Sequence, residues 1–294
     1  MTMQKIGLVT VLFNSADVLP GFFESLSIQK FRNYTLYIID NSLDDVSMNV
    51  ARDLTEQYQM TNVVLIKNKE NVGVAAANNQ GIQLSLESDC DYVLLLNNDI
   101  EFKDENLLGS MLELAERRQE KLMVPKIYFH DSGKIWCAGG KINILKGTTT
   151  HRGEGEVDHG QFDQDIHINY APTCFMLIHK LVFAKIGVMD EKYFVYYDDT
   201  DFVWRANFAG FKIYYWAKGQ VWHKVSSSTG GALSAFSVYY CERNRLYFIR
   251  KNFSLFFKIY ALSFYFLTRP LKFKLFSKKL RPHLFSGITD GMKM

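Results

Sequence analysis

The apolar segment DYVLLLNND (91–99) ends in two amides and a carboxylate, Asn97, Asn98 and Asp99. Carboxylate and amide oxygens are the ligands that a hard cation such as Mg²⁺ or Mn²⁺ prefers, and the cation often shares them with phosphate oxygens. Asn and Asp are also favoured in turns and helix caps. Taken alone, this tripeptide therefore leaves a metal site and an ordinary turn both open.

A second acidic group lies in the segment YFVYYDDTDFVWR (193–205), where Asp198 and Asp199 are adjacent and Asp201 follows. Neighbouring carboxylates repel each other, which raises the pKa of one of them toward the value that a general base needs. The alternative is that first-turn acids complement the dipole of a helix, with Asp201 pairing with Arg205 at i, i+4. That alternative accounts for Asp201 but not for the adjacent pair.

His223 follows an apolar segment and precedes the Ser/Gly-rich stretch 226–231. It is either a structural histidine or a third metal ligand, and the stretch after it is either a mobile lid or a linker. The segment NVGVAAANNQGI (71–82) places small residues at a predicted helix start, which favours phosphate binding or close packing on a sheet. The chain contains neither GxxxxGK[ST] nor GxGxxG, so neither a P-loop nor a classical dinucleotide fold is supported.

Alternating strand and helix patterns are predicted to position these side chains. The strands cover 5–13, 34–40, 62–68 and 91–99, and the helices cover 16–29, 44–58 and 73–87. Continuous apolar strands in such an order predict an α/β fold with a mostly parallel sheet covered on both faces. Ligands bind beyond the carboxyl ends of such strands. Polar residues stand at four successive strand ends: Asn14; Asp40 and Asn41; Asn68 and Asn71; Asn97, Asn98 and Asp99.

The second half of the chain has a looser pattern. We predict a strand at 121–129, hairpins or a surface loop at 134–156, and a strand running into a helix at 171–187. A short helix at 198–210 and a strand at 211–217 follow, and long helices begin after Leu233.

The totals place the chain among globular proteins. Its 294 residues are 48% hydrophobic, which is enough for a large core. The net charge of +3 hides an asymmetry, because residues 243–289 contain eleven Lys or Arg and no Asp or Glu. Four widely spaced cysteines without a CxxC pair predict buried thiols in a reducing compartment and no zinc site. The short apolar run 6–13, with no cleavage site after it, predicts a cytoplasmic chain.

Five motifs in order from about Ile6 to Asn252 resemble those of glycosyltransferase family 2, which has the GT-A fold. They are VTVLFN; IIDNSLDD, with Leu43 in place of a serine; NVGVAAANNQGI; LLLNNDIEF, with Asn98 in place of the proline of L-N-P-D; and YFVYYDDTDFVWRANFAG, with Asp198 in place of a glutamate. In addition, YYCERNRLYFIRKN (239–252) is similar to the R-N segment of rhamnosyltransferase-like members.

The resemblance implies a catalytic domain over 1–235, with a nucleotide-sugar half at about 1–100 and an acceptor half at about 101–235, followed by a C-terminal helical region over 236–294. It implies that Asp99, Asn97 and His223 hold Mn²⁺ or Mg²⁺, that Asp199 is the catalytic base and that Asp198 is its nearest competitor. The substrate-binding residues it implies are Thr10, Asn14, Asp40, Asn41, Asn71, Gly73, Asn78, Asn97, Asn98, Asp201, Arg243 and Asn244.

The implied reaction is inverting transfer of a sugar from a nucleoside-diphosphate sugar to a saccharide or lipid-linked saccharide in surface polysaccharide synthesis. The rhamnosyltransferase-like segment favours dTDP-rhamnose as the donor, with UDP-hexoses next. Two other classes stay open. A sugar nucleotidyltransferase would carry a Gly/Arg/Lys-rich triphosphate loop, and the chain shows none before Arg32. A non-catalytic sugar-nucleotide-binding scaffold would not need the intact acidic set.

The C-terminal region suggests a further partner. Residues 252–270 are apolar and aromatic but include Lys258, and a basic segment, 271–285, follows. A lysine inside the apolar stretch disfavours a membrane span. An interfacial helix backed by basic residues fits better and predicts a peripheral protein at the inner face of the cell membrane. The alternative is a helix that packs on the core. No nucleic-acid recognition motif is present, and a homo-oligomer stays open.

Overall fold

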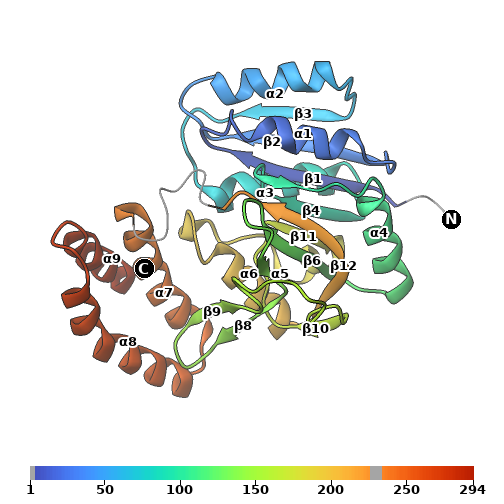
Figure 1. Ribbon diagram of the computed structural model, residues 1–294. Coiled ribbons are helices and arrows are strands. Elements are labelled where there is room, and N and C mark those ends of the chain that lie inside the picture. Colours follow the sequence, from blue (N-terminus) through green and yellow to red (C-terminus); the bar gives the residue numbers. More distant parts are fainter. Residues whose placement is uncertain (1–3, 226–233) are drawn as a thin grey trace.

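A computed structural model describes residues 4–225 and 234–294. Its first half is a parallel sheet of four strands, β1 (Ile6–Leu12), β2 (Tyr34–Asp40), β3 (Val63–Lys67) and β4 (Tyr92–Leu96). β1 pairs in parallel with both β2 and β4, and β2 pairs in parallel with β3 (Figure 1). All four carboxyl ends therefore reach the same edge of the sheet.

Helices cover both faces of this sheet, because its strands carry apolar side chains on both sides. Leu8 and Leu12 of β1 lie in one core with α1 (Leu19–Ser27), α2 (Val46–Gln57) and α4 (Leu107–Arg118). Val9 of the same strand lies in the opposite core, with α3 (Val74–Glu87), α5 (Lys180–Ile186) and α6 (Asp198–Phe208). This is the alternation expected of a strand buried on both faces.

The sheet continues beyond β4 as a mixed sheet. β11 (Phe175–His179) lies antiparallel between β4 and β6 (Leu122–Phe129), and β12 (Ile213–His223) runs parallel to β6. The strand order is β10-β12-β6-β11-β4-β1-β2-β3. The shorter elements are β5 (Ile100–Glu101), β7 (Ile135–Cys137), β8 (Gly140–Asn143), β9 (Thr148–His151), β10 (Ile166–Ile168) and the 3₁₀ helix η1 (Glu191–Tyr193). β8 and β9 form a separate antiparallel hairpin.

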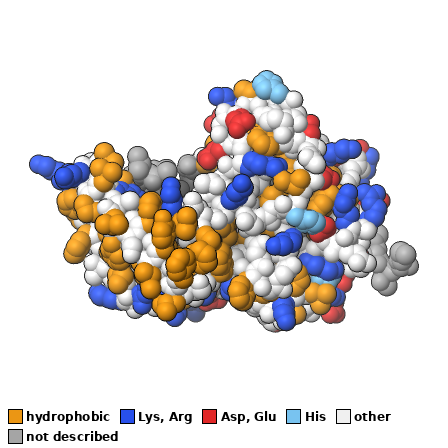
Figure 2. Space-filling view, turned by 90° about the horizontal axis from the view of Figure 1, so that it is seen from below, with side chains coloured by type: hydrophobic (Ala, Val, Ile, Leu, Met, Phe, Trp, Pro, Cys, Tyr) orange, Lys and Arg blue, Asp and Glu red, His pale blue; other side chains and the backbone are white. Residues whose placement is uncertain are grey.

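Three C-terminal helices, α7 (Ala235–Asn252), α8 (Leu255–Leu275) and α9 (Arg281–Lys293), form a lobe beside the sheet (Figure 1). Glu242 of α7 is buried and accepts hydrogen bonds from Tyr265, Arg269 and Lys272 of α8. The outward side of α8 is apolar and exposed, and Figure 2 shows a cluster of hydrophobic side chains over this lobe. No helix within the described ranges is both long and apolar enough to cross a membrane.

The predicted α/β class and the predicted elements are confirmed in their main features. Strand β2 matches its predicted bounds, and the other predicted strands and helices lie within a few residues of theirs, except β12, which extends to His223. The helix α4 was missed, although Leu107, Met111, Leu114 and Ala115 recur on one buried face. The four cysteines are free thiols; Cys90, Cys137 and Cys174 are buried, as predicted, whereas Cys241 is half-buried. The expected lid at 226–231 lies outside the described residues.

Candidate functional site

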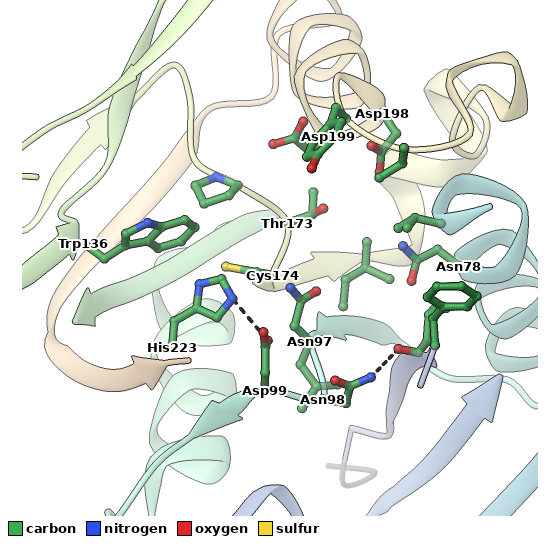
Figure 3. A pocket seen from close by; sticks show the side chains of 18 of the residues that line it. Asn78, Asn97, Asn98, Asp99, Trp136, Thr173, Cys174, Asp198, Asp199 and His223 are labelled. Carbon is green, nitrogen blue, oxygen red and sulfur yellow. Dashed lines mark hydrogen bonds and ion pairs between the residues drawn. The ribbon is translucent and has the colours of Figure 1, made fainter. Parts of the chain in front are cut away.

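A cavity of about 390 Å³ opens at the carboxyl edge of the sheet. Its lining comes from the end of β4, the end of β12, the first turn of α6 and the segment that leads into β11. The lining includes Asp99, His223, Asp198 and Asp199. The two acidic groups, which are 99 residues apart in the sequence, therefore line the same cavity. Figure 3 shows Asp99 and His223 on one side of the cavity and the Asp198–Asp199 pair on the opposite side, with Asn97, Thr173 and Cys174 between them.

The first wall of the cavity is built by Asp99 and His223. Nε2 of His223 lies 3.1 Å from Oδ1 of Asp99, and both side chains are largely buried. β12 brings them together because His223 pairs with Ile100 of β5, the residue after Asp99. Nδ1 of His223 is buried and has no hydrogen-bond partner within the described residues. The exposed Asn97 side chain adds an amide beside this pair (Figure 3).

Asn98 fixes the turn that presents Asp99. Its side-chain amide donates to the backbone oxygen of Val11 and to Oγ of Ser15, which joins the end of β4 to the end of β1 (Figure 3). The family pattern has proline at this position, and a proline ring restricts the backbone. Here the two hydrogen bonds of Asn98 hold the turn instead.

The opposite wall carries the carboxylate pair. Oδ2 of Asp199 accepts a hydrogen bond from the Tyr170 hydroxyl at 2.8 Å, and Oδ1 accepts from the amide and the hydroxyl of Thr200. Burial raises the pKa of Asp198 to about 7, and the charge of Asp199 adds to this. Burial also raises the pKa of Asp199, whereas the bonds from Tyr170 and Thr200 oppose that rise. The pKa of both acids is therefore raised, chiefly by burial, and for Asp198 the repulsion that the sequence suggested adds to it.

An unusual turn presents this pair. Phe194, Tyr196 and Tyr197 all have positive φ, at 63°, 61° and 66°. Bulky residues rarely adopt this conformation, and each such residue stores strain. The side-chain amide of Asn244 on α7 donates to the backbone oxygens of Tyr193, Val195 and Tyr196 at 2.7–2.9 Å. Asn244 therefore holds the turn in the conformation that starts α6 at Asp198.

Several predicted substrate residues lie beside the cavity rather than in its lining. Asp40 is fully buried and pairs with Lys67 at 2.8 Å, and Asn41 donates to the backbone oxygen of Gly73. The Asn71 side chain caps the amide of Gly73. Of the residues predicted to bind substrate, the cavity lining includes Asn78, Asn97 and Asn98; it does not include Thr10, Asn14, Asp40, Asn41, Asn71, Gly73, Asp201, Arg243 or Asn244.

Asp201 and Arg243 make internal contacts. Asp201 is fully buried and accepts hydrogen bonds from Tyr193, Arg205, Lys251 and Asn252, so the predicted i, i+4 pair with Arg205 is present. The Arg243 guanidinium donates to the backbone oxygens of Lys192 and Tyr193 and lies over the ring of Tyr240. Both side chains are therefore engaged in contacts within the protein.

The comparison with known families decides the class of the chain. The family described as Glycosyl transferase family 2 matches residues 8–187, which is more than half of the chain. The chain belongs to glycosyl transferase family 2. The family match ends before the turn at 194–197 and before α6, so Asp99 lies within it and Asp199 lies beyond it.

Distant relatives of this family-2 chain extend the similarity. It is 23% identical over 246 residues to the N-acetylglucosaminyl-diphospho-decaprenol L-rhamnosyltransferase of Mycobacterium tuberculosis, covering 76% of both chains. It is 22% identical to the amylovoran biosynthesis glycosyltransferase AmsB of Erwinia amylovora, covering 96% of this chain and 89% of AmsB. It is 22% identical to the low-salt glycan biosynthesis hexosyltransferase Agl10 of Haloferax volcanii, of which it spans 62%.

A solved structure supports the fold of this family-2 chain. The crystal structure of S. aureus TarS 1–349 in complex with UDP aligns with a TM-score of 0.63 at 13% identity, covering 99% of this chain and 80% of that chain. At this identity the likeness concerns the fold alone, which is GT-A-like.

Three aromatic residues of the site, Trp136, His151 and Tyr170, were not predicted from the sequence. Their rings form a continuous line from His223 to Asp199: Trp136 lies 4.5 Å from the His223 ring and 4.7 Å from the His151 ring, and His151 stacks 6.0 Å from Tyr170. Burial lowers the pKa of His151, which favours the neutral imidazole. Their only sequence signal was their position in the 134–156 segment and just before the strand at 175–179.

The residues at Asp99 fit a divalent cation of the kind used by GT-A enzymes. Asp99, His223 and Asn97 offer a carboxylate oxygen, an imidazole nitrogen and an amide oxygen on one wall, a donor set compatible with Mn²⁺ or Mg²⁺. Within 4–225 and 234–294, no group of three or more His, Cys, Asp or Glu side chains could hold a metal alone. A cation here would therefore need further oxygen ligands, such as those of a substrate diphosphate.

Proposed function

We propose that the chain is an inverting, metal-dependent glycosyltransferase. It moves a sugar from a nucleoside-diphosphate sugar to a saccharide or lipid-linked saccharide acceptor in surface polysaccharide synthesis. One observation carries this proposal: the Asp99–His223 pair and the Asp198–Asp199 pair face each other across a single cavity at the carboxyl edge of the sheet. Opposite walls of this kind are what in-line displacement requires, because the leaving group and the incoming hydroxyl lie on opposite sides of the sugar carbon.

The first wall is proposed to bind the diphosphate of the donor. Asp99, His223 and Asn97 would hold Mn²⁺ or Mg²⁺, which supplies Lewis-acid stabilisation for the charge of the departing diphosphate. Asn78 lines the cavity on the side of α3 and would contact the nucleotide sugar. Behind it, the side chains of Asn41 and Asn71 hydrogen-bond to the backbone of Gly73 and order the loop that precedes α3.

The second wall is proposed to activate the acceptor. Asp199 accepts the proton of the acceptor hydroxyl as that oxygen attacks the anomeric carbon, and a base of this kind contributes roughly 10²–10⁴-fold. Asp198 is the nearest competitor for this role because it lines the same cavity and has a raised pKa. Attack from this wall, opposite the diphosphate, inverts the anomeric centre.

The donor is proposed to be dTDP-rhamnose, with a UDP-hexose as the next choice. The similarity to the mycobacterial rhamnosyltransferase supports rhamnose. The similarities to a hexosyltransferase, and to TarS, whose structure contains UDP, support the second choice.

A panel of sugar nucleotides tests the activity. We expect one donor, in the presence of Mn²⁺ or Mg²⁺, to raise the unfolding temperature and to be slowly hydrolysed by the wild type. Asp199→Asn should keep the stabilisation by that donor but lose at least about a hundredfold in turnover. Full turnover by Asp199→Asn would remove the assignment of the base, and Asp198→Asn would then be the next variant. Pyrophosphate release would favour a nucleotidyltransferase, and stabilisation without turnover a scaffold.

The C-terminal lobe is proposed to lie on an anionic membrane, which would make the protein peripheral at the inner face of the cell membrane. Leu255, Ile259, Leu267, Leu271 and Leu275 of α8 recur at intervals of four or eight residues, and all are more than half exposed. The surrounding segment 243–289 carries eleven Lys or Arg and no Asp or Glu, which complements anionic headgroups. A helix with these two properties lies in the interface plane.

Liposome co-sedimentation tests this surface. We expect wild-type protein to bind vesicles that contain phosphatidylglycerol at low salt, and to bind phosphatidylcholine vesicles weakly. Leu267→Glu should reduce binding several-fold. Leu43→Glu is a matched control, because Leu43 and Leu267 are both 81% exposed but Leu43 lies at the far end of the molecule, between β2 and α2. Equal loss in both variants, or no binding by the wild type, would remove the membrane proposal.

A further inference from the structure

We infer that Tyr170 is a positioning residue, whose hydroxyl orients the Asp199 carboxylate and keeps it as the charged member of the Asp198–Asp199 pair. The catalytic consequence of this inference rests on the proposed role of Asp199 as the base. The contact itself is independent of that role: the Tyr170 hydroxyl lies 2.8 Å from Oδ2 of Asp199.

Tyr170 fixes Asp199 relative to the rest of the cavity. The other donors to Asp199 are the amide and the hydroxyl of Thr200, which is the next residue on α6 and moves with it. Tyr170 belongs instead to the segment that leads through Thr173 and Cys174 of the cavity lining into β11. Its bond therefore joins the first turn of α6 to the central sheet.

Tyr170 is itself held rigidly. It is 4% exposed, and its backbone forms a bridge with Gly140. A Cβ at Gly140 would lie 2.9 Å from Cδ1 of Tyr170, so only glycine lets the ring pack this closely. Thr149 of β9, whose strand pairs with that of Gly140, acts on the phenol in the direction that lowers its pKa. Burial raises the pKa of Tyr170 well above its ordinary value, so the phenol keeps its proton and acts as a donor.

This donor distinguishes the two acids. A hydrogen bond to a carboxylate favours its charged form. Asp199 receives such a bond from another element, whereas the hydrogen bonds to Asp198 come from the backbone of its own helix turn. The charge of Asp199 and the proton of Asp198 are therefore the expected arrangement near neutral pH. Other titratable groups also interact electrostatically with Asp199. The charge of His151 lowers the pKa of Asp199, and the charge of Asp199 raises the pKa of Cys137, Cys174, Tyr197 and Cys241.

Tyr170→Phe tests the inference, with Tyr215→Phe as the matched control. Tyr215 is also fully buried, but its hydroxyl donates to the backbone oxygen of Phe162 and not to a carboxylate. The first measurement is NMR titration of protein labelled with ¹³C at the aspartate carboxyls, where the Asp199 signal is identified by its absence in Asp199→Asn. The second is the pH profile of donor hydrolysis, with dTDP-rhamnose and UDP-glucose as probes.

In Tyr170→Phe we expect the Asp199 signal to titrate about one pH unit higher than in the wild type, and kcat to fall about tenfold with the donor KM unchanged. Tyr215→Phe should match the wild type in both measurements. Thr149→Val, a milder change that replaces a polar group acting on the phenol, should shift the titration in the same direction if Tyr170→Phe folds poorly.

An unshifted Asp199 titration in both Tyr170→Phe and Thr149→Val would overturn the inference. A shifted titration with unchanged turnover would support the positioning by Tyr170 and would count against Asp199 as the base. The two proposals therefore fail by different results.

Discussion

Replacement of Asp201 by Asn separates a framework role from a substrate role. The Asp201 side chain is fully buried and accepts from Nε of Arg205 at 2.8 Å, Nζ of Lys251 at 3.0 Å, Nδ2 of Asn252 at 2.8 Å and the Tyr193 hydroxyl at 3.1 Å. These partners belong to η1, α6 and α7, so one carboxylate joins three elements around the proposed base.

The size of the effect follows from the loss of charge. Asn has a similar shape but leaves Arg205 without its buried counter-charge, whereas Lys251 keeps its ion pair with Asp190 at 2.7 Å; breaking a buried pair costs about 3–5 kcal/mol. The Arg205 and Lys251 side chains are 20% and 27% exposed, so water partly compensates them and the lower end applies. A loss of about 3 kcal/mol lowers the unfolding temperature of a chain of this size by roughly 6 °C.

The assay is thermal unfolding by circular dichroism, together with stabilisation by UDP or dTDP in the presence of Mn²⁺. Asp53→Asn on α2 is the control, because Asp53 is exposed. We expect Asp201→Asn to unfold about 6 °C lower and to keep its nucleotide-dependent stabilisation. An unfolding temperature like that of Asp53→Asn, with the nucleotide response lost, would refute the framework role and restore the substrate role that the sequence suggested.

Three further predictions follow from buried polar groups. Asn244→Ala should reduce turnover more than tenfold and lower the unfolding temperature by about 2–6 °C, because buried backbone oxygens lose their donor and the turn before Asp198 can relax; circular dichroism and donor hydrolysis measure this. Glu242→Gln should destabilise the chain by about 3 kcal/mol in urea unfolding, because Arg269 and Lys272 lose their counter-charge. Burial raises the pKa of Asp198 from 3.8 to about 7 in the folded protein. Protonation of Asp198 therefore stabilises the folded state most below pH 3.8, and this contribution is lost as the pH rises through about 7. Asp198→Asn should therefore be more stable than the wild type at pH 8 but not at pH 4, and a reversed order would contradict the shift.

The sequence predicted the strand ends and helix starts of the site well, because these depend on local patterns. Asp99 follows an apolar strand and Asp198 starts an amphipathic helix, and both are found there. That the two groups face one cavity followed from the family resemblance and not from spacing. The strand β11, antiparallel between β4 and β6, could not be placed from its own residues, because sheet order depends on long-range packing.

The cavity wall of Trp136 and His151 was beyond local sequence reasoning for the same reason. Both lie in the 134–156 segment, which the sequence assigned only to hairpins or a surface loop. The wall exists because the β8–β9 hairpin folds back, with Gly140 paired to His151 and bridged to Tyr170. An aromatic residue in a hairpin has no sequence mark that distinguishes a cavity wall from a surface position.

The turn at 194–197, which presents Asp198 and Asp199 to the cavity, is held by residues that lie outside the cavity lining. Three bulky residues with positive φ violate the local preferences from which turns are predicted, at a cost of order 1–3 kcal/mol each. Partners distant in the chain offset that strain. Asn244 donates to the backbone oxygens of Val195 and Tyr196 in the turn and of Tyr193 just before it. The amide of Val74 at the start of α3 donates to the backbone oxygen of Phe194.

Gly73 makes that last contact possible. It has a φ of 87°, and a Cβ there would lie 2.6 Å from the backbone oxygen of Phe194. Any other residue would separate the start of α3, on the proposed nucleotide side, from the turn that carries Asp198 and Asp199. The position of this turn relative to α3 is therefore set by contacts at Gly73 and Asn244, and a side chain at position 73 should reduce turnover through the position of the base even where nucleotide binding is retained.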